Sequence, residues 1–234
     1  MILPKIVLIF SLYALSVNTL LADEGNTNLI GIVEWSSSYV SEGVDELPNA
    51  TILEGVFEYS LGPLLFGVSN IVGIPQPLFD VTFYSLYGFF VGPVELYLGA
   101  GVQFTPVPRE PYTIEGYLEL HTPLIAGAVL FSDLLYDFKE EKGAFIGIGL
   151  DRTFSVGQLF TLTPFVITGI DAGYLSEDNN FRFNHIYTGL EAAYNLTDQF
   201  LIAASLNKLF ALDNLKSMGE GDLLWVSSWF EYQW

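Results

Sequence analysis

Acidic side chains recur at alternate positions of several segments, and this is the pattern in the chain that could do chemistry. Segments 94–104, 114–121 and 185–194 alternate apolar with polar residues, and the acids take polar positions. Successive side chains of a strand point to opposite faces, so each segment would have one apolar and one acidic face. Eleven acids share this parity: Glu34, Glu54, Glu58, Asp80, Glu95, Glu115, Glu119, Asp151, Asp171, Glu191 and Glu231. A surface lined by them would attract cations.

The composition supports strands in a membrane. Hydrophobic residues make up 51% of the chain and its mean hydropathy is +0.42, yet residues 23–234 contain no apolar run long enough for a membrane helix. A lipid-facing strand needs an apolar residue only at every second position. The sequence therefore predicts an all-β fold, a transmembrane antiparallel up-and-down β-barrel.

Fitting the two-residue period along the chain predicts about twelve strands, with ten as the alternative. The expected ranges are 29–40, 51–60, 63–71, 78–89, 94–104, 112–121, 124–134, 143–154, 159–172, 183–196, 200–210 and 223–234. Every second connection is short, as in Leu61-Gly62, and those between are mostly longer and more polar, as in 41–48 and 211–222. Outer-membrane barrels have short periplasmic turns and longer external loops, and an even strand count puts both termini in the periplasm.

Residues 1–22 have the pattern of a secretory signal peptide, with a short basic start, an apolar run and Leu20-Leu21-Ala22 before the acidic pair that follows. A retained membrane anchor is the alternative. The barrel would then be residues 23–234. Removing Lys5 with the signal leaves seven basic and 27 acidic residues, a net charge of −20. This charge argues against a nucleic-acid partner, because phosphate binding needs a basic surface.

The acids are expected to face the interior of the barrel. Even at roughly 1 kcal/mol each, eleven carboxylates facing hydrocarbon would cost as much as the whole stability of a domain. A dry core could not hold so many unpaired anions. The interior would therefore contain water and counter-ions, or several acids would be protonated through mutual repulsion.

Inward aromatic residues are expected to narrow this interior. They are Tyr84, Tyr97, Tyr117, Tyr187, Trp225 and Trp229. A twelve-stranded barrel is intermediate in size between small barrels, whose interior is filled by side chains, and the wide porins. The sequence thus predicts a narrow, cation-preferring channel for small solutes, with the eleven acids lining the pore. The alternative is a non-conducting structural or surface-interaction barrel.

An enzymatic role has little support in the sequence. The chain has two histidines, His121 and His185, and no cysteine, so no zinc-binding spacing occurs. Neither histidine has the His-x-Ser arrangement of twelve-stranded outer-membrane phospholipases. We expect no catalytic residue, metal or cofactor, and a lipid-modifying enzyme is the less favoured alternative.

Aromatic residues are expected at the membrane interfaces and at the C-terminus. Trp35, Tyr39, Tyr59 and Phe89 are predicted to belong to aromatic girdles. The last strand ends with Phe230, Tyr232 and Trp234 on its outward positions. This ending is typical of chains that the barrel-assembly machinery recognises. We expect that machinery and outer-membrane lipid as partners, and the outer membrane of a Gram-negative bacterium as the location.

The N-terminal third resembles the TorF-type porin family. Ser37-Ser38-Tyr39, Gly43-Val44, 53–59 and Gly67-Val68-Ser69-Asn70 follow the order and spacing of the family's opening elements, and 94–99 is similar to its next acidic-aromatic strand. Glu42 stands where an Arg is usual in the family. The resemblance covers about 75 residues. It implies a bacterial outer-membrane barrel with a pore role and transfers no substrate or catalytic residue.

Overall fold

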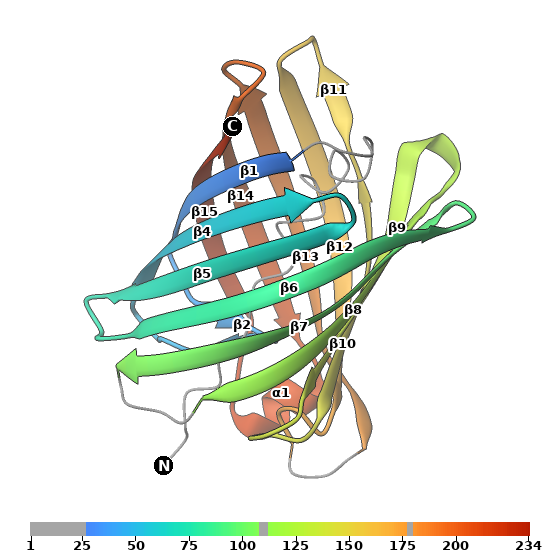
Figure 1. Cartoon of the computed structure of the whole chain (residues 1–234). Helices are drawn as coiled ribbons and strands as arrows, with labels where there is room; N and C mark the ends of the chain where they lie inside the picture. Colours follow the sequence, from blue (N-terminus) through green and yellow to red (C-terminus); the bar gives the residue numbers. More distant parts are fainter. Residues whose placement is uncertain (1–26, 108–111, 177–179) are drawn as a thin grey trace.

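The computed structural model describes residues 27–107, 112–176 and 180–234, which form a closed antiparallel β-barrel (Figure 1). The predicted signal peptide lies outside the described residues. Twelve wall strands confirm the predicted number: β1 (Thr27–Ser36), β4 (Thr51–Leu61), β5 (Leu64–Ile74), β6 (Phe79–Val91), β7 (Val94–Val107), β8 (Thr113–Pro123), β9 (Ala128–Asp137), β10 (Ala144–Arg152), β12 (Phe160–Ala172), β13 (Phe181–Asn195), β14 (Phe200–Ala211) and β15 (Leu223–Gln233). No helix among these described ranges is long and apolar enough to cross a membrane.

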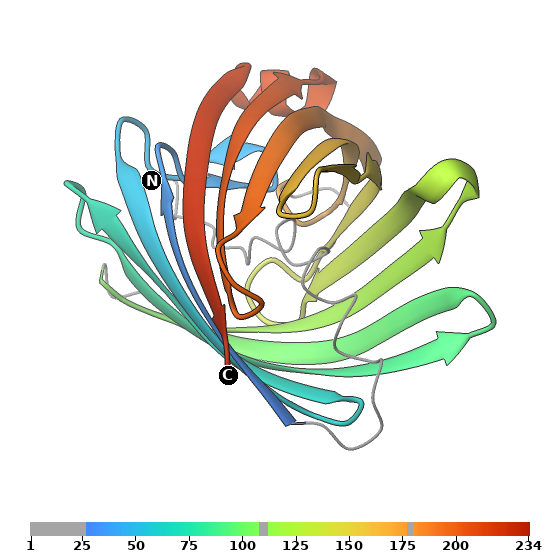
Figure 2. The ribbon, with the colours of Figure 1, turned by 90° about the horizontal axis from the view of Figure 1, so that it is seen from above.

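The wall closes because its first and last strands pair with each other. Residues 30–36 of β1 pair antiparallel with residues 227–233 of β15, and β10 pairs with both β9 and β12. The short strand β11 (Phe154–Val156) extends the ladder by pairing with β12. The view along the barrel shows the ring of strands (Figure 2). Each of the twelve described wall strands therefore has a neighbour on both sides, as a structure surrounded by hydrocarbon requires.

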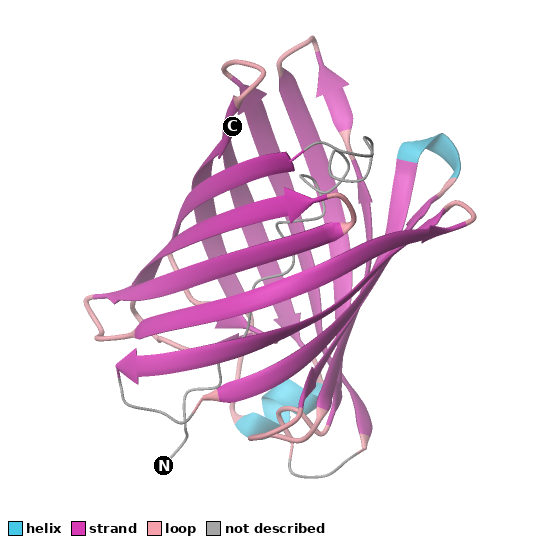
Figure 3. Ribbon diagram, viewed as in Figure 1, coloured by secondary structure: helices cyan, strands magenta, loops and turns pink. Residues whose placement is uncertain are grey.

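The two ends of the barrel differ in their connections (Figure 3). At the end that we call the turn rim, Gly62-Pro63 and Gly92-Pro93 join strands, and both glycines have positive φ. The 3-10 turn η3 (Ile125–Gly127) and the end of β15 also lie there. At the opposite loop rim, residues 37–50 carry the hairpin of β2 (Val40–Ser41) and β3 (Val44–Asp45), and α1 (Asp213–Met218) joins β14 to β15.

Burial alternates along the wall strands with the predicted period. In β4, Leu53, Phe57 and Tyr59 are 41–46% exposed, whereas Glu54 and Glu58 are each 5% exposed. The same alternation recurs on the other wall strands, where large apolar side chains such as Phe83 and Leu206 are outside. The apolar side of the wall therefore faces outward and the acidic side faces the interior.

The prediction of aromatic girdle residues is wrong for one of the four. Trp35, Tyr59 and Phe89 are exposed on the outer wall, but Tyr39 is only 1% exposed and packs in a cluster with Leu47 and its neighbours. The physical reason is that β1 ends at Ser36, so its alternation does not extend to Tyr39. The chain instead turns into the barrel, and segment 41–48, which was expected to be an external loop, contains the β2–β3 hairpin.

Glycines on the inner face make room for aromatic rings on the neighbouring strand. A Cβ atom added at Gly67 would lie 2.1 Å from the ring of Tyr84, and one at Gly149 would lie 2.2 Å from Phe131. Each ring therefore occupies the space directly above a glycine on the adjacent strand, and it lies against the wall. These aromatic residues narrow the interior less than side chains that extend toward the barrel axis.

Gly67→Ala tests this packing. We expect a loss of about 1–3 kcal/mol in stability, because the new methyl group overlaps the Tyr84 ring, which also donates a 2.6 Å hydrogen bond to Glu58. Urea unfolding in detergent micelles measures the effect. Gly221→Ala is the control, since a Cβ there meets nothing within 4 Å. Equal stability of both variants and the unmodified chain would contradict the packing argument.

Candidate functional site

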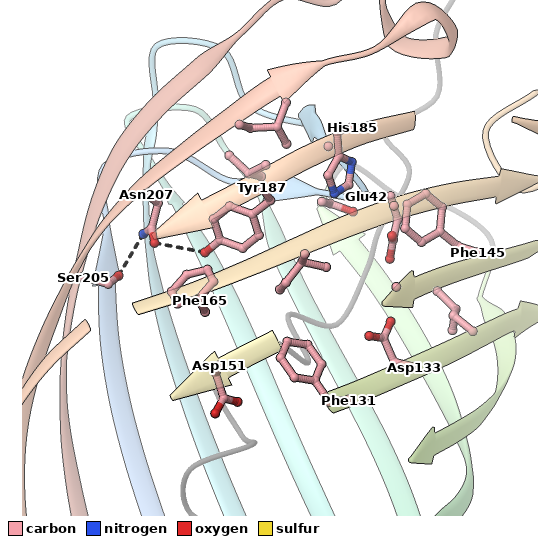
Figure 4. A pocket seen from close by; sticks show the side chains of 18 of the residues that line it. Glu42, Phe131, Asp133, Phe145, Asp151, Phe165, His185, Tyr187, Ser205 and Asn207 are labelled. Carbon is pink, nitrogen blue, oxygen red and sulfur yellow. Dashed lines mark hydrogen bonds between the residues drawn. The ribbon is translucent and has the colours of Figure 1, made fainter. Parts of the chain in front are cut away.

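A cavity of about 150 Å³ lies inside the barrel, between the β2–β3 hairpin and wall strands that include β9, β12 and β13 (Figure 4). Six carboxylates line it: Glu34, Glu42, Glu119, Asp133, Asp151 and Glu191. No Lys or Arg is among the described residues that line it. The cavity therefore gathers acidic side chains inside a wall with an apolar exterior.

The structure places four of the eleven predicted acids at this cavity, namely Glu34, Glu119, Asp151 and Glu191. The other seven lie elsewhere on the wall strands: Glu54, Glu58, Asp80, Glu95, Glu115, Asp171 and Glu231. Glu95 and Asp151 are half-buried, and the other nine are 9% exposed or less. These low exposures agree with acids that face the interior of the barrel.

Two cavity acids were missed from the sequence. Asp133 lies on β9, where the inner face also carries Phe131 and Leu135, so no clear polar alternation marks that strand. Glu42 lies on the hairpin, which a reading of wall strands assigns to an external loop. The available signal was local: Glu42-Gly43 lies between Val40 and Val44, as the turn of a short hairpin does.

Tyrosine hydroxyls partner several interior carboxylates. Tyr117 and Tyr97 donate to the acids two residues before them, Glu115 at 2.7 Å and Glu95 at 2.5 Å, because a spacing of two puts both side chains on one face. A neutral hydroxyl satisfies a carboxylate oxygen without cancelling its charge. The hydrogen bonds therefore hold these two acids in place on the inner face.

Some buried carboxylate oxygens have no hydrogen-bond partner within the protein. They include both oxygens of Asp80 and Oε1 of Glu119. The other oxygen of Glu119, Oε2, lies 3.8 Å from Nε2 of His121. No group of three or more His, Asp or Glu side chains suited to holding a metal ion occurs within the described ranges. Water or a diffusible solute is the partner that fits these oxygens.

His185 has partners from the loop rim. Its ring stacks on Phe145 with centroids 6.0 Å apart, and its Nδ1 lies 3.3 Å from Nδ2 of Asn184. A serine in hydrogen-bond reach of a histidine is the feature that a lipid hydrolase requires. The contacts found for these rings are Glu119 for His121 and Asn184 for His185.

The β2–β3 hairpin closes the loop-rim side of the cavity. Glu42 and Gly43 have φ values of 48° and 90°, as a type I′ turn requires. A Cβ at Gly43 would lie 2.4 Å from Nδ1 of His185 and 2.8 Å from Leu215 of α1, so the turn is in tight contact with the wall and the opposite loop. Asn184 also donates a hydrogen bond to the carbonyl of Glu42. In Figure 2 the blue hairpin lies inside the ring of strands.

Docking of the hairpin should depend on pH through Glu42. Its burial, and then the negative charges of Asp133, Glu115 and other acids, raise the pKa of the Glu42 carboxyl well above its usual range. The docked hairpin therefore keeps a proton that the undocked hairpin releases above about pH 4.5. Docking is strongest at acidic pH and weakens as the pH rises towards the raised pKa.

Ser41→Cys reports this effect, because Ser41 is only 2% exposed and the chain has no other thiol. We expect labelling by a thiol reagent to accelerate between pH 6 and pH 9 by more than thiol ionisation accounts for. With Glu42→Gln added, the dependence that remains should be that of the thiol alone. An identical pH profile for the two variants would show that Glu42 does not control docking.

Comparison with known proteins identifies the fold. No family model matches the chain, and no curated protein sequence matches it. Among solved structures, the KdgM porin superposes with a TM-score of 0.57 at 10% identity, over 88% of this chain and 98% of that one. The NanC porin gives 0.55 at 11% identity over the same shares, and an outer membrane channel from Pseudomonas putida F1 gives 0.57 at 10% identity, over 91% and 98%. The chain thus has the fold of outer-membrane, porin-like β-barrels.

Proposed function

We propose that this barrel is a narrow outer-membrane channel that passes small solutes and prefers cations. The observation that carries the proposal is the cavity with six carboxylates and no Lys or Arg among its described lining residues. The low dielectric of the surrounding wall strengthens the field of these charges and concentrates cations inside. The similar structures are porins and channels, which supports a pore role for the fold.

The solute of this channel is expected to differ in charge from the ligand of KdgM, one of the similar proteins. KdgM has been solved in complex with oligogalacturonate, which is a polyanion. An anionic oligosaccharide would meet acids throughout this cavity, and like charges held close together repel strongly in a low-dielectric site. We therefore propose that the specificity here has the opposite sign.

The remaining partners and the location are proposed with the channel. The resemblance to the TorF-type family favours a pore in the outer membrane of a Gram-negative bacterium, with turn rim and termini on the periplasmic side. The C-terminal residues Phe230 and Trp234 are 49% and 57% exposed on the outer wall. There they are accessible to lipid and to the barrel-assembly machinery.

Planar-bilayer recordings test the proposal. Under a KCl gradient we expect a reversal potential that favours K⁺. Combining Glu34→Gln, Asp151→Asn and Glu191→Gln should remove most of this preference, because three of the six carboxyl groups that line the cavity are lost. Absence of any conductance, or a preference for Cl⁻, would end the channel proposal.

A second candidate is a non-conducting structural or surface-interaction barrel. The observation that favours it is the docked β2–β3 hairpin, whose turn contacts His185 and Leu215 across the interior. The two candidates differ when the hairpin is removed. A channel gains conductance, whereas a structural barrel with a filled interior stays closed.

A further inference from the structure

Three aromatic side chains form a row on one side of the cavity. Tyr187 of β13 stacks on Trp225 of β15 with ring centroids 5.1 Å apart, and Phe165 of β12 meets Tyr187 edge-on at 4.9 Å. The Tyr187 hydroxyl donates to Oδ1 of Asn207 at 3.0 Å, and Nδ2 of Asn207 donates to Oγ of Ser205 at 2.8 Å (Figure 4). The row is therefore held in place before any solute arrives.

Carboxylates lie directly beside this row. Asp151 is the register partner of Phe165 across β10 and β12, so the two side chains are neighbours on the inner face. Glu191 follows Tyr187 on the same face of β13, and Glu34 lines the same cavity. The cavity thus joins an aromatic surface to a group of acids.

A further hydrogen-bond acceptor faces the same cavity without a partner. Glu119 is 9% exposed and lines the cavity, and its Oε1 has no hydrogen bond within the protein. Asp133, its register partner on β9, adds a second carboxylate there. A solute with N–H donors and positive charge would satisfy these acids.

We infer that this cavity binds a small organic cation, a molecule with ammonium or guanidinium groups on an apolar body. The inference rests on the proposed channel function and specifies its solute class. Carboxylates attract a hydrated inorganic cation too, but aromatic faces add attraction for an organic cation that has shed its water. A carboxylate on the solute would meet six acids, so an amine without an acid group binds better than an amino acid.

Agmatine and arginine form a matched pair of probes, because they share the guanidinium and the carbon chain and differ by one carboxylate. We expect isothermal titration of the full barrel in detergent to give agmatine at least about tenfold tighter binding than arginine. Glu191→Gln should weaken agmatine binding about tenfold or more, since it removes a buried charge partner. Tyr187→Leu should weaken it several-fold through loss of the aromatic face.

Glu95→Gln is the matched control, because Glu95 is an interior acid that does not line the cavity. Its agmatine affinity should stay within about twofold of the unmodified protein, as expected of an acid outside the site. If Glu95→Gln and Glu191→Gln weakened agmatine binding equally, the attraction would come from all interior acids together, and the proposed site would be refuted. Equal affinity for agmatine and arginine, or no binding, would also overturn it. K⁺-preferring conductance without agmatine binding would refute only the binding site. Agmatine binding without conductance would refute only the channel function.

Discussion

Replacing residues 40–45 by a two-residue Asn-Gly link is expected to raise the single-channel conductance several-fold. The replacement removes β2, its turn and β3, which together close the cavity toward the loop rim. The backbone tolerates it because Tyr39 and Glu46 are already joined, with the Glu46 amide donating to the Tyr39 carbonyl at 2.8 Å. A two-residue turn of Asn-Gly suits such a paired position.

The control for this deletion is Glu42→Asn in the full-length hairpin. It keeps the hairpin and creates the same favourable turn sequence, since Gly43 follows, and it removes one carboxylate. Comparing planar-bilayer recordings of the two variants distinguishes the effect of the hairpin's volume on conductance from the effect of its carboxyl group. Unchanged conductance in the deletion would show that the hairpin does not obstruct the path, and absence of conductance in both would favour the structural barrel.

The wall of the barrel could be predicted from the sequence because a single period determines it. Lipid outside and water inside require opposite polarity on the two faces of each strand. The alternation therefore indicates where each strand lies, which of its faces points outward and how many strands there are. The segments around Val94–Phe104 and Leu223–Trp234 show this directly, and β7 and β15 occupy them. Strand ends deviate by a few residues, as for β1, because polar residues at the rims do not alternate.

The interior of the loop rim could not be predicted in the same way. The hairpin, α1 and Tyr174-Leu175 pack in one cluster. The contacts at this rim join residues far apart in the sequence, such as Asn184 with Glu42 and Gly43 with Leu215. No local period records such contacts. The same limit applies to β9, where Phe131 and Leu135 face inward because Gly149 gives Phe131 space and Phe145 is the register partner of Leu135.

Asp171→Ala is expected to destabilise the loop rim on the order of 3 kcal/mol or more. Asp171, at the end of β12, is fully buried and accepts hydrogen bonds at 2.8, 2.8 and 3.1 Å from the backbone amides of Tyr174, Leu175 and Ser176. Its Oδ2 also accepts from Nδ2 of Asn214 at 3.3 Å. Hydrogen bonds to ionised groups contribute about 1.5–3 kcal/mol each, and alanine leaves these buried donors unpaired.

The loss should extend beyond the segment that Asp171 holds. Nδ2 of Asn214 donates to Asn184 at 2.9 Å as well, and Asn184 donates to the carbonyl of Glu42, so Asp171 is connected to the hairpin through two asparagines. In Asp171→Ala we therefore expect both a lower urea midpoint and faster thiol labelling at Ser41→Cys. Asp213→Asn, at an exposed acid in the same rim, should change neither. A lower midpoint with unchanged labelling would mean that the network stabilises the segment after β12 alone and that the hairpin docks independently of it.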